Sequence, residues 1–460
     1  MNTGRRKFLT TTAANCSLLG SSSIFSTLLN LKLAEAAATD QSDADGYKAL
    51  VCVFMFGGND SFNMLIPAEE DEYNLYKSTR GELAIPISAD AENAALLLST
   101  PSEDGRHFAV HPAMSELREL YSKGHLAFLA NTGTLVEPTT VKSYKNRSTT
   151  LPAALFSHND QRDQWQTGLP QTKSHTGWLG RAADLLETTA DNRAFSAISL
   201  NGNNLLQTGR QSGPFVITDT GSVEITSDIA SQLFQLFESP NAPKLSSVFH
   251  EEFLKASKES LLNNAQFSQA FNQFSLPPAS AADSRLSFSL DAVARSIMVG
   301  KSVGLKRQTF FILAPGWDNH HGLLEDHHFL LHDVSQSLGR FQKMIDSMSL
   351  ANQVTTFSAS DFGRTLRSNG RGTDHAWGGN HFILGGAVKG GTIYGNYPEQ
   401  LILNDGLDVG KNGRLLPTTS CDQYFADLLS WFGISKNVLP EVLPNLENFP
   451  SAPLGFMHPG

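Results

Sequence analysis

Acidic and imidazole side chains follow apolar segments at several places in this 460-residue chain. The motifs are Gly57-Gly58-Asn59-Asp60-Ser61, Trp317-Asp318-Asn319-His320-His321, Ser360-Asp361-Phe362-Gly363-Arg364 and Asp374-His375. Carboxylates and imidazoles together bind divalent ions such as zinc, manganese or iron. In open α/β sheets, ligands bind outside the carboxyl ends of the strands. The motifs therefore predict a divalent metal site of a hydrolase and leave the substrate open.

The predicted metal ligands are one residue or pair from each motif: Asp60, Asp318, His320, Asp361 and His375. Seven of the fourteen histidines lie between residues 318 and 381, which favours ligation over random scatter. Alternatives remain open for some of these groups. Asp60 would also suit a turn cap, because Asn and Asp favour turns, and His381 would suit packing at the start of the next strand.

Arg364 is the predicted anion-binding side chain, since a guanidinium can grip an oxyanion with two parallel hydrogen bonds. The alternative is an ion pair with one of the neighbouring aspartates.

Three further histidines fall on the helix predicted over residues 323–348, where a solvated or packed role is favoured: His327, His328 and His332.

The elements that must position these groups follow a strand, helix, strand pattern. Apolar runs predict buried strands over residues 48–56, 125–131, 308–314 and 353–359, and a ribbon over residues 382–394. Periodic segments predict helices over residues 112–123, 176–187, 323–348 and 421–432, with a long functional loop over residues 132–175. The fold class expected is α/β, with a mostly parallel central sheet between helices.

The chain is expected to form one large α/β domain over residues 39–460, with a helical insertion over residues 226–305 that covers the sheet. Two lobes are the alternative, because a single core seldom grows beyond about 250–300 residues. Cys52 and Cys421 are the cysteines that remain after residue 38, and the sequence leaves open whether they bond.

The first 38 residues have the features of a twin-arginine signal peptide, with Arg5-Arg6 before a weakly apolar stretch and small residues at its end. A retained membrane anchor is the alternative, although polar residues interrupt the stretch. We therefore expect a periplasmic or secreted protein that meets the twin-arginine export machinery and has no stable membrane span after residue 38. The formal charge of −10 excludes nucleic-acid binding, which requires clustered Lys and Arg.

The motifs as a set resemble the bacterial "domain of unknown function 1501" family over nearly the whole mature chain. They are Gly-Gly-Asn-Asp-Ser-Phe-Asn at 57–63, Trp-Asp-Asn-His at 317–320, Ser-Asp-Phe-Gly-Arg-Thr at 360–365, Gly-Thr-Asp-His at 372–375, Gly-Gly-Ala-Val-Lys-Gly-Gly at 385–391 and Pro-Thr-Thr-Ser-Cys-Asp-Gln-Tyr at 417–424. This resemblance implies a fold like that of the alkaline phosphatase and sulfatase superfamily, with one or two divalent metals.

Carried over by motif, the resemblance makes Asp60, Asp318 with His320, Asp361 and His375 metal ligands. Phe362 stands where the superfamily usually has a histidine, which leaves one metal position in doubt. No Cys-x-Pro-x-Arg motif is present, so a standard sulfatase mechanism is excluded. The superfamily nucleophile is a Ser or Thr at a helix start, for which the candidates are Ser61, Thr132 and Thr134, with activated water as the alternative.

Two functions follow from these residues and this resemblance. The first is an exported metal-dependent hydrolase of a phosphate or sulfate ester, with a small-molecule or polymer substrate and zinc or manganese as candidate metals. The second is a non-catalytic secreted binding or assembly protein on the same fold. In a third interpretation the motifs are structural turns, ion pairs and caps.

Overall fold

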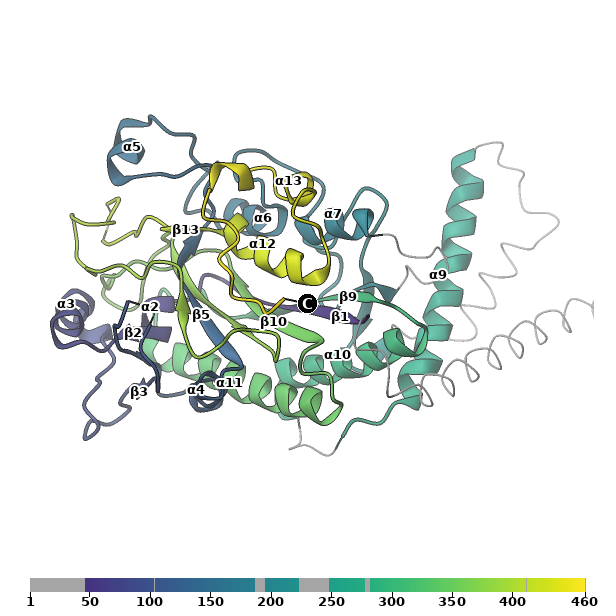
Figure 1. Ribbon diagram of the computed structural model, residues 1–460, viewed down its shortest axis with the longest axis horizontal. Helices are drawn as coiled ribbons and strands as arrows, with labels where there is room; N and C mark the ends of the chain where they lie inside the picture. Colours follow the sequence, from purple (N-terminus) through teal and green to yellow (C-terminus); the bar gives the residue numbers. More distant parts are fainter. Residues whose placement is uncertain are drawn as a thin grey trace, which may run out of the picture.

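The computed structural model describes residues 46–102, 104–186, 195–222, 248–277, 282–410 and 412–459. The predicted signal peptide and residues 226–247 of the predicted insertion therefore lie outside the described residues. A central mixed sheet is covered by helices on both faces (Figure 1). The α/β class predicted from the sequence is confirmed.

The middle of the sheet consists of three parallel strands. Strand β1 (Lys48–Phe56) pairs with β9 (Arg307–Pro315) on one side and with β10 (Val354–Ser360) on the other. Successive side chains of β1 alternate between two apolar cores, because neighbouring residues of a strand point to opposite faces. Val51 and Val53 face one core, whereas Cys52 faces the other. This double burial explains the continuous apolar run that predicted the strand.

The remaining strands extend this core to the order β12-β5-β11-β10-β1-β9-β6-β7-β8, and β13 also pairs with β5. Their bounds are β5 Leu126–Gly133, β6 Ala197–Ser199, β7 Phe215–Thr218, β8 Gly221–Ser222, β11 Gly379–Leu384, β12 Ile393–Tyr394 and β13 Thr419–Ser420. The pairs β10–β11, β11–β5 and β7–β8 are antiparallel, and the other pairs of this sheet are parallel. The sheet is therefore mostly parallel, as predicted.

Two helical layers cover the sheet (Figure 1). One contains α4 (Ser115–Ser122), α10 (Arg285–Ser302) and α11 (Leu323–Ser347), and the other contains α6 (His158–Thr167), α7 (Trp178–Leu185), α12 (Cys421–Phe432) and α13 (Leu439–Val442). Helix α12 begins with a capping box between Ser420 and Gln423 and ends at Gly433, which has φ +115°. These local signals explain why the sequence predicted its bounds correctly.

The protein also has a smaller antiparallel sheet, in which the strands are ordered β2-β4-β3. The elements around it are α2 (Ser61–Met64), β2 (Leu65–Pro67), α3 (Glu70–Arg80), the 3₁₀ turn Gly81–Leu83, β3 (Leu96–Leu97) and β4 (Phe108–Val110). Near the C-terminus a second 3₁₀ turn spans Leu446–Asn448. The described part of the predicted insertion is helical, because α9 (Val248–Gln273) precedes α10. Helix α10 packs against α11 and β9 and so belongs to the helical layer.

The segment predicted as a loop over residues 132–175 contains two helices, α5 (Val141–Asn146) and α6. That expectation was wrong for α6 because its buried face carries amides, including Gln161 and Gln164, where an apolar stripe would have revealed a helix.

Cys52 and Cys421 are both buried and unbonded. Burial raises the pKa of each thiol, which disfavours the reactive thiolate. Among the described residues, no helix combines the length and apolar character needed to cross a bilayer.

Candidate metal centre

Three loops that follow the central strands meet at the carboxyl edge of the sheet. The first follows β1 and contains Gly57, whose φ is +123°. A Cβ on Gly57 would lie 2.4 Å from the backbone nitrogen of Asp318, so only glycine lets this loop contact the loop after β9. The third loop follows β10 and begins with Asp361. Parallel pairing thus brings together motifs that are about 300 residues apart in the sequence.

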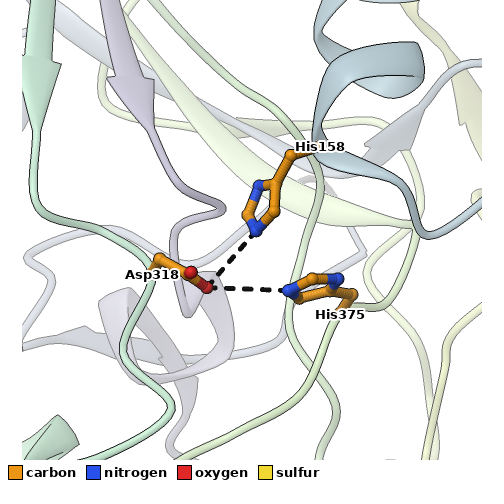
Figure 2. Close-up of side chains that lie close together, drawn as sticks. All are labelled: His158, Asp318 and His375. Atoms are coloured by element: carbon orange, nitrogen blue, oxygen red, sulfur yellow. Dashed lines mark ion pairs between the residues drawn. The ribbon is translucent and has the colours of Figure 1, made fainter.

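Three imidazoles surround one carboxylate oxygen at this edge. Nε2 of His158, His320 and His375 lies 3.4, 3.2 and 3.6 Å, respectively, from Oδ1 of Asp318. Figure 2 shows His158 at the start of a helix and His375 on a loop, both directed toward Asp318. We call these four residues the histidine–aspartate cluster. About half of the Asp318 side chain is exposed, so the cluster is open to solvent.

The outer ring nitrogens of the cluster face hydrogen-bond acceptors. Nδ1 of His158 lies 2.7 Å from Oδ2 of the buried Asp361, and Nδ1 of His375 lies 3.0 Å from the carbonyl oxygen of Phe156. Nδ1 of His320 lies 3.3 Å from a carboxylate oxygen of Asp374. Because a carbonyl oxygen can only accept, Nδ1 of His375 carries its proton. This arrangement orients metal-binding histidines in proteins and leaves Nε2 as the free ligand atom.

The surroundings of His375 decide the protonation of its ring. Burial, with the charges of His158, Arg364 and His320, lowers the pKa of His375 despite the opposing effect of the Phe156 carbonyl. His375 is thus neutral at pH 7, and its Nε2 lone pair faces Asp318. Nε2 of His158 is buried and has no hydrogen-bond partner among the described residues. A lone pair of His375 directed toward a carboxylate oxygen, beside a buried ring nitrogen without a partner among the described residues, is an arrangement that a cation would stabilise.

The spacing of the cluster also fits a metal ion. Tetrahedral zinc bound at about 2.0–2.1 Å by nitrogen and oxygen keeps its ligand atoms roughly 3.3–3.4 Å apart. The observed separations from Asp318 Oδ1 are 3.2–3.6 Å, and the Nε2 atoms of His320 and His375 are 3.0 Å apart. The ligand atoms of His158, Asp318 and His375 all lie within 4.8 Å of one another, which fits a divalent ion, and His320 lies beside this set.

Arg364 serves as a structural clamp at this edge. Its Nε donates to the Gly58 carbonyl and its Nη1 to the Thr373 carbonyl. Its Nη2 bonds the carbonyl of Gly57 and a carboxylate oxygen of Asp318. Partial burial on its own would raise the pKa of Asp318, but the hydrogen bond and charge of Arg364 outweigh it and lower that pKa. The geometry favours the alternative that the sequence left open, an ion pair, over a contact with substrate.

Asp60 and Arg80 form a fully buried ion pair, with 2.8 Å between Oδ2 and Nη2. Asp60 Oδ2 also accepts from the Thr373 hydroxyl at 3.2 Å. Within the described residues, no contact joins the Asp60 carboxylate to the histidine–aspartate cluster. Asp60 therefore lies outside the group of predicted ligands that converge, because its carboxylate is paired with the guanidinium of Arg80.

The other predicted residues occupy supporting positions. Oδ2 of Asp361 contacts Nδ1 of His158 and orients that ring, while its Oδ1 is buried without a hydrogen-bond partner among the described residues, so direct ligation by Asp361 stays a prediction. Ser61 is buried, and its Oγ accepts a hydrogen bond from the Asn380 backbone at 2.7 Å. The other two candidate nucleophiles, Thr132 and Thr134, are also buried. The structure therefore places no hydroxyl of these three at the cluster.

Phe362 packs inside the cluster. Its ring centroid lies 4.7 Å from that of His158 and 4.8 Å from that of His375. A Cβ on Gly58 would come within 2.5 Å of the Phe362 ring, so this loop also needs glycine there. Phe362 therefore fixes the planes of two imidazoles by contact, at the position where the superfamily of the resemblance usually has a histidine.

His158 is the cluster residue that sequence reasoning missed. It begins α6, and two residues before it Phe156 has φ +71°. That left-handed conformation is uncommon for a bulky residue and directs the Phe156 carbonyl toward His375. The one available signal was Ser157 before His158, because Ser often precedes a helix.

A family model described as "Protein of unknown function (DUF1501)" matches residues 47–402. The chain belongs to the DUF1501 family. The resemblance stated from the motifs is confirmed. No curated protein matches the sequence.

Several solved structures are similar over much of their length, with low TM-scores. The crystal structure of Ps i-CgsB has 10% identity and a TM-score of 0.32, and the match covers 87% of this chain and 77% of that chain. BT1596, described as a 2-O GAG sulfatase, has 8% identity and a TM-score of 0.29, covering 90% and 76%. A TAB5 alkaline phosphatase mutant with bound Mg has 9% identity and a TM-score of 0.24, covering 74% and 91%. The chemistry of the cluster therefore rests on its own residues.

Proposed function

We propose that this DUF1501 protein is an exported metal-dependent hydrolase that cleaves a phosphate or sulfate ester. The observation that carries the proposal is the convergence of three imidazole Nε2 atoms on Asp318 Oδ1, with acceptors opposite each Nδ1. A divalent ion bound there would supply Lewis acidity and lower the pKa of a water molecule.

The protein's own residues prepare this chemistry in three ways. His158, His320, His375 and Asp318 would hold the ion. Asp361 keeps the proton of His158 on Nδ1, which leaves Nε2 free. Arg364 keeps Asp318 ionised at neutral pH, since it lowers the pKa of that carboxyl. The burial of Ser61, Thr132 and Thr134 favours water over a side chain as the nucleophile.

The alternative is a secreted binding protein that holds a metal without turnover. The absence of an exposed hydroxyl among those three candidates favours this alternative, because the superfamily reaction would need one. Metal content followed by an ester screen distinguishes the two functions.

The test begins with elemental analysis of mature protein purified without chelator. We expect near-stoichiometric zinc or manganese in the wild type and none in His158→Ala or His375→Ala. His332→Ala is the matched control, because His332 is exposed on α11. Wild-type protein that stays folded and metal-free after incubation with both ions would overturn the proposal.

The second step compares release of nitrophenol from aryl phosphate and aryl sulfate esters by metal-loaded wild type and His158→Ala. Turnover that depends on His158 supports the hydrolase. Stoichiometric metal without turnover of any ester in a broad panel supports the binding protein.

Export is part of the proposal and has its own test. Replacing Arg5 and Arg6 by Lys should hold the protein in the cytoplasm, because the twin-arginine pair is the address that the export machinery reads. Immunoblots of periplasmic and cytoplasmic fractions measure the distribution. An unchanged periplasmic fraction would contradict this route.

A further inference from the structure

Arg414 lies directly beside the histidine–aspartate cluster and is held there by two contacts. Its Nε donates to the carbonyl oxygen of His375 at 2.8 Å. Its Cζ lies 3.9 Å from the ring centroid of Phe156, whose carbonyl in turn accepts from His375 Nδ1. Arg414, Phe156 and His375 thus form a closed set of contacts that fixes the plane of the guanidinium.

The two terminal nitrogens of Arg414 remain available. Neither Nη1 nor Nη2 has a hydrogen bond or ion pair within the part of the chain that the structure describes. Neither atom is buried, so solvent reaches both Nη1 and Nη2. A guanidinium stacked on a ring keeps its N–H groups in its own plane, where they can bind an oxyanion with two parallel bonds.

The contrast with Arg364 decides which guanidinium can serve a ligand. All three nitrogens of Arg364 already bond to carbonyls or to Asp318. Its side chain is fully buried, whereas Arg414 is half-buried. An anion could therefore reach Arg414 without breaking any contact of the fold.

We infer that Arg414 binds the anionic group of the substrate and orients it beside the histidine–aspartate cluster. This inference rests on the proposed hydrolase function and assigns the anion-binding role to Arg414, where the sequence had suggested Arg364. The ligand chemistry is a tetrahedral oxyanion, either phosphate or sulfate.

The experiment is calorimetric titration of the mature protein with inorganic phosphate and, separately, with inorganic sulfate. Each titration is done with metal-loaded and with chelator-treated protein. The variants are Arg414→Gln and Arg414→Lys, and the charge-matched control is Arg118→Gln, an exposed residue of α4. The oxyanion that binds more tightly to the wild type identifies the ester class.

We expect Arg414→Gln to weaken binding of the preferred oxyanion about 10- to 100-fold, the usual range for hydrogen bonds to charged groups. The oxyanion affinity of Arg414→Lys should fall between those of the wild type and Arg414→Gln, because lysine keeps the charge and loses the planar fork. Metal content should be the same in all variants, and Arg118→Gln should bind the oxyanion like the wild type.

Equal oxyanion affinity in wild type and Arg414→Gln would overturn the inference, and so would a wild type that binds neither oxyanion. If Arg414→Gln also loses metal, the chelator-treated titrations decide, since they compare the two proteins without any ion. If no protein holds metal, the proposed hydrolase fails, while the ratio of the chelator-treated affinities still tests Arg414.

Discussion

The described residues include two groups of three histidines that differ in what their ring nitrogens face. In the histidine–aspartate cluster, three Nε2 atoms converge on the half-exposed Asp318. In the second group, His111 packs edge-on against His327 and His328, with ring centroids 5.6 and 5.5 Å apart. We call these three residues the packed histidines.

Two of the packed histidines bond to neutral groups. His327 Nε2 lies 2.8 Å from the Asn59 side-chain oxygen, and His111 Nδ1 accepts from the Ala113 backbone. Burial lowers the pKa of His111 to about 2 and that of His327 to about 3, and the charges of Arg80 and Arg364 add to the effect at His327. Both rings are therefore neutral parts of the interior. The comparison teaches that the partners of the ring nitrogens separate the open cluster from the packed rings, whereas histidine density in the sequence does not.

The largest expected effect is the loss of metal binding in His375→Ala. Removing a group that merely orients a ligand typically weakens metal affinity 10–100-fold, so removing a ligand should weaken it by more than about 100-fold. Competition with a chromophoric chelator measures this affinity. His332→Ala should match the wild type, and a His375→Ala variant with wild-type affinity would break the distinction between the two groups.

His327→Ala should have the opposite pattern, with stability lost and metal retained. The substitution leaves the Asn59 oxygen without its partner and opens a cavity beside Trp317, which together should cost about 2–4 kcal/mol. Urea unfolding measures the free energy of unfolding, and elemental analysis measures the metal. Loss of metal without loss of stability would show that the packed histidines belong to the functional site.

Asp361→Asn should give a smaller change in metal affinity, about 10-fold. The amide oxygen can still accept from His158 Nδ1, but it lacks the charge that strengthens this bond. Asp374→Asn is the comparison variant and should have a weaker effect, because Asp374 is partly exposed and lies 3.3 Å from His320, whereas Asp361 is fully buried. Chelator competition on both variants ranks them, and the reverse order would contradict the orienting role of Asp361.

The sequence predicted the parts of the site that follow apolar strands. β1, β9 and β10 are buried on both faces, so their composition revealed them, and Asp318 and Asp361 follow their ends. His158 could not be predicted in this way, because α6 buries amides and has no apolar stripe. Its position depends on the Phe156 backbone conformation, which the residue type disfavours.

The sequence also could not reveal which carboxylates form ion pairs inside the folded protein. Asp60 follows β1 as the motif predicts, but Arg80 at the end of α3 pairs with it in the interior. Nothing in the residues between them fixes that pairing, since it depends on how α3 packs against the small sheet. Charge pairing is a property of the folded chain, and pattern reasoning does not determine it.

The smallest expected effect is a difference in acid sensitivity between wild type and His327→Gln. The pKa of His327 is lowered from about 6.5 to about 3 on folding, so the unfolded chain binds its proton first as the pH falls. The stabilisation is therefore complete above the unfolded pKa and is lost as the pH falls from about 6.5 toward 3. Between pH 8 and pH 5.5 this residue should account for about 1.4 kcal/mol of lost stability.

His327→Gln removes that titration and keeps a donor for the Asn59 oxygen, so its stability should fall less with acid. Urea unfolding of chelator-treated protein at the two pH values measures the difference and excludes any effect of metal release. His332→Gln is the control, because His332 is exposed on α11. If wild type and His327→Gln lost the same free energy, His327 would bind a proton in the folded protein and would not be the neutral packing residue that the comparison requires.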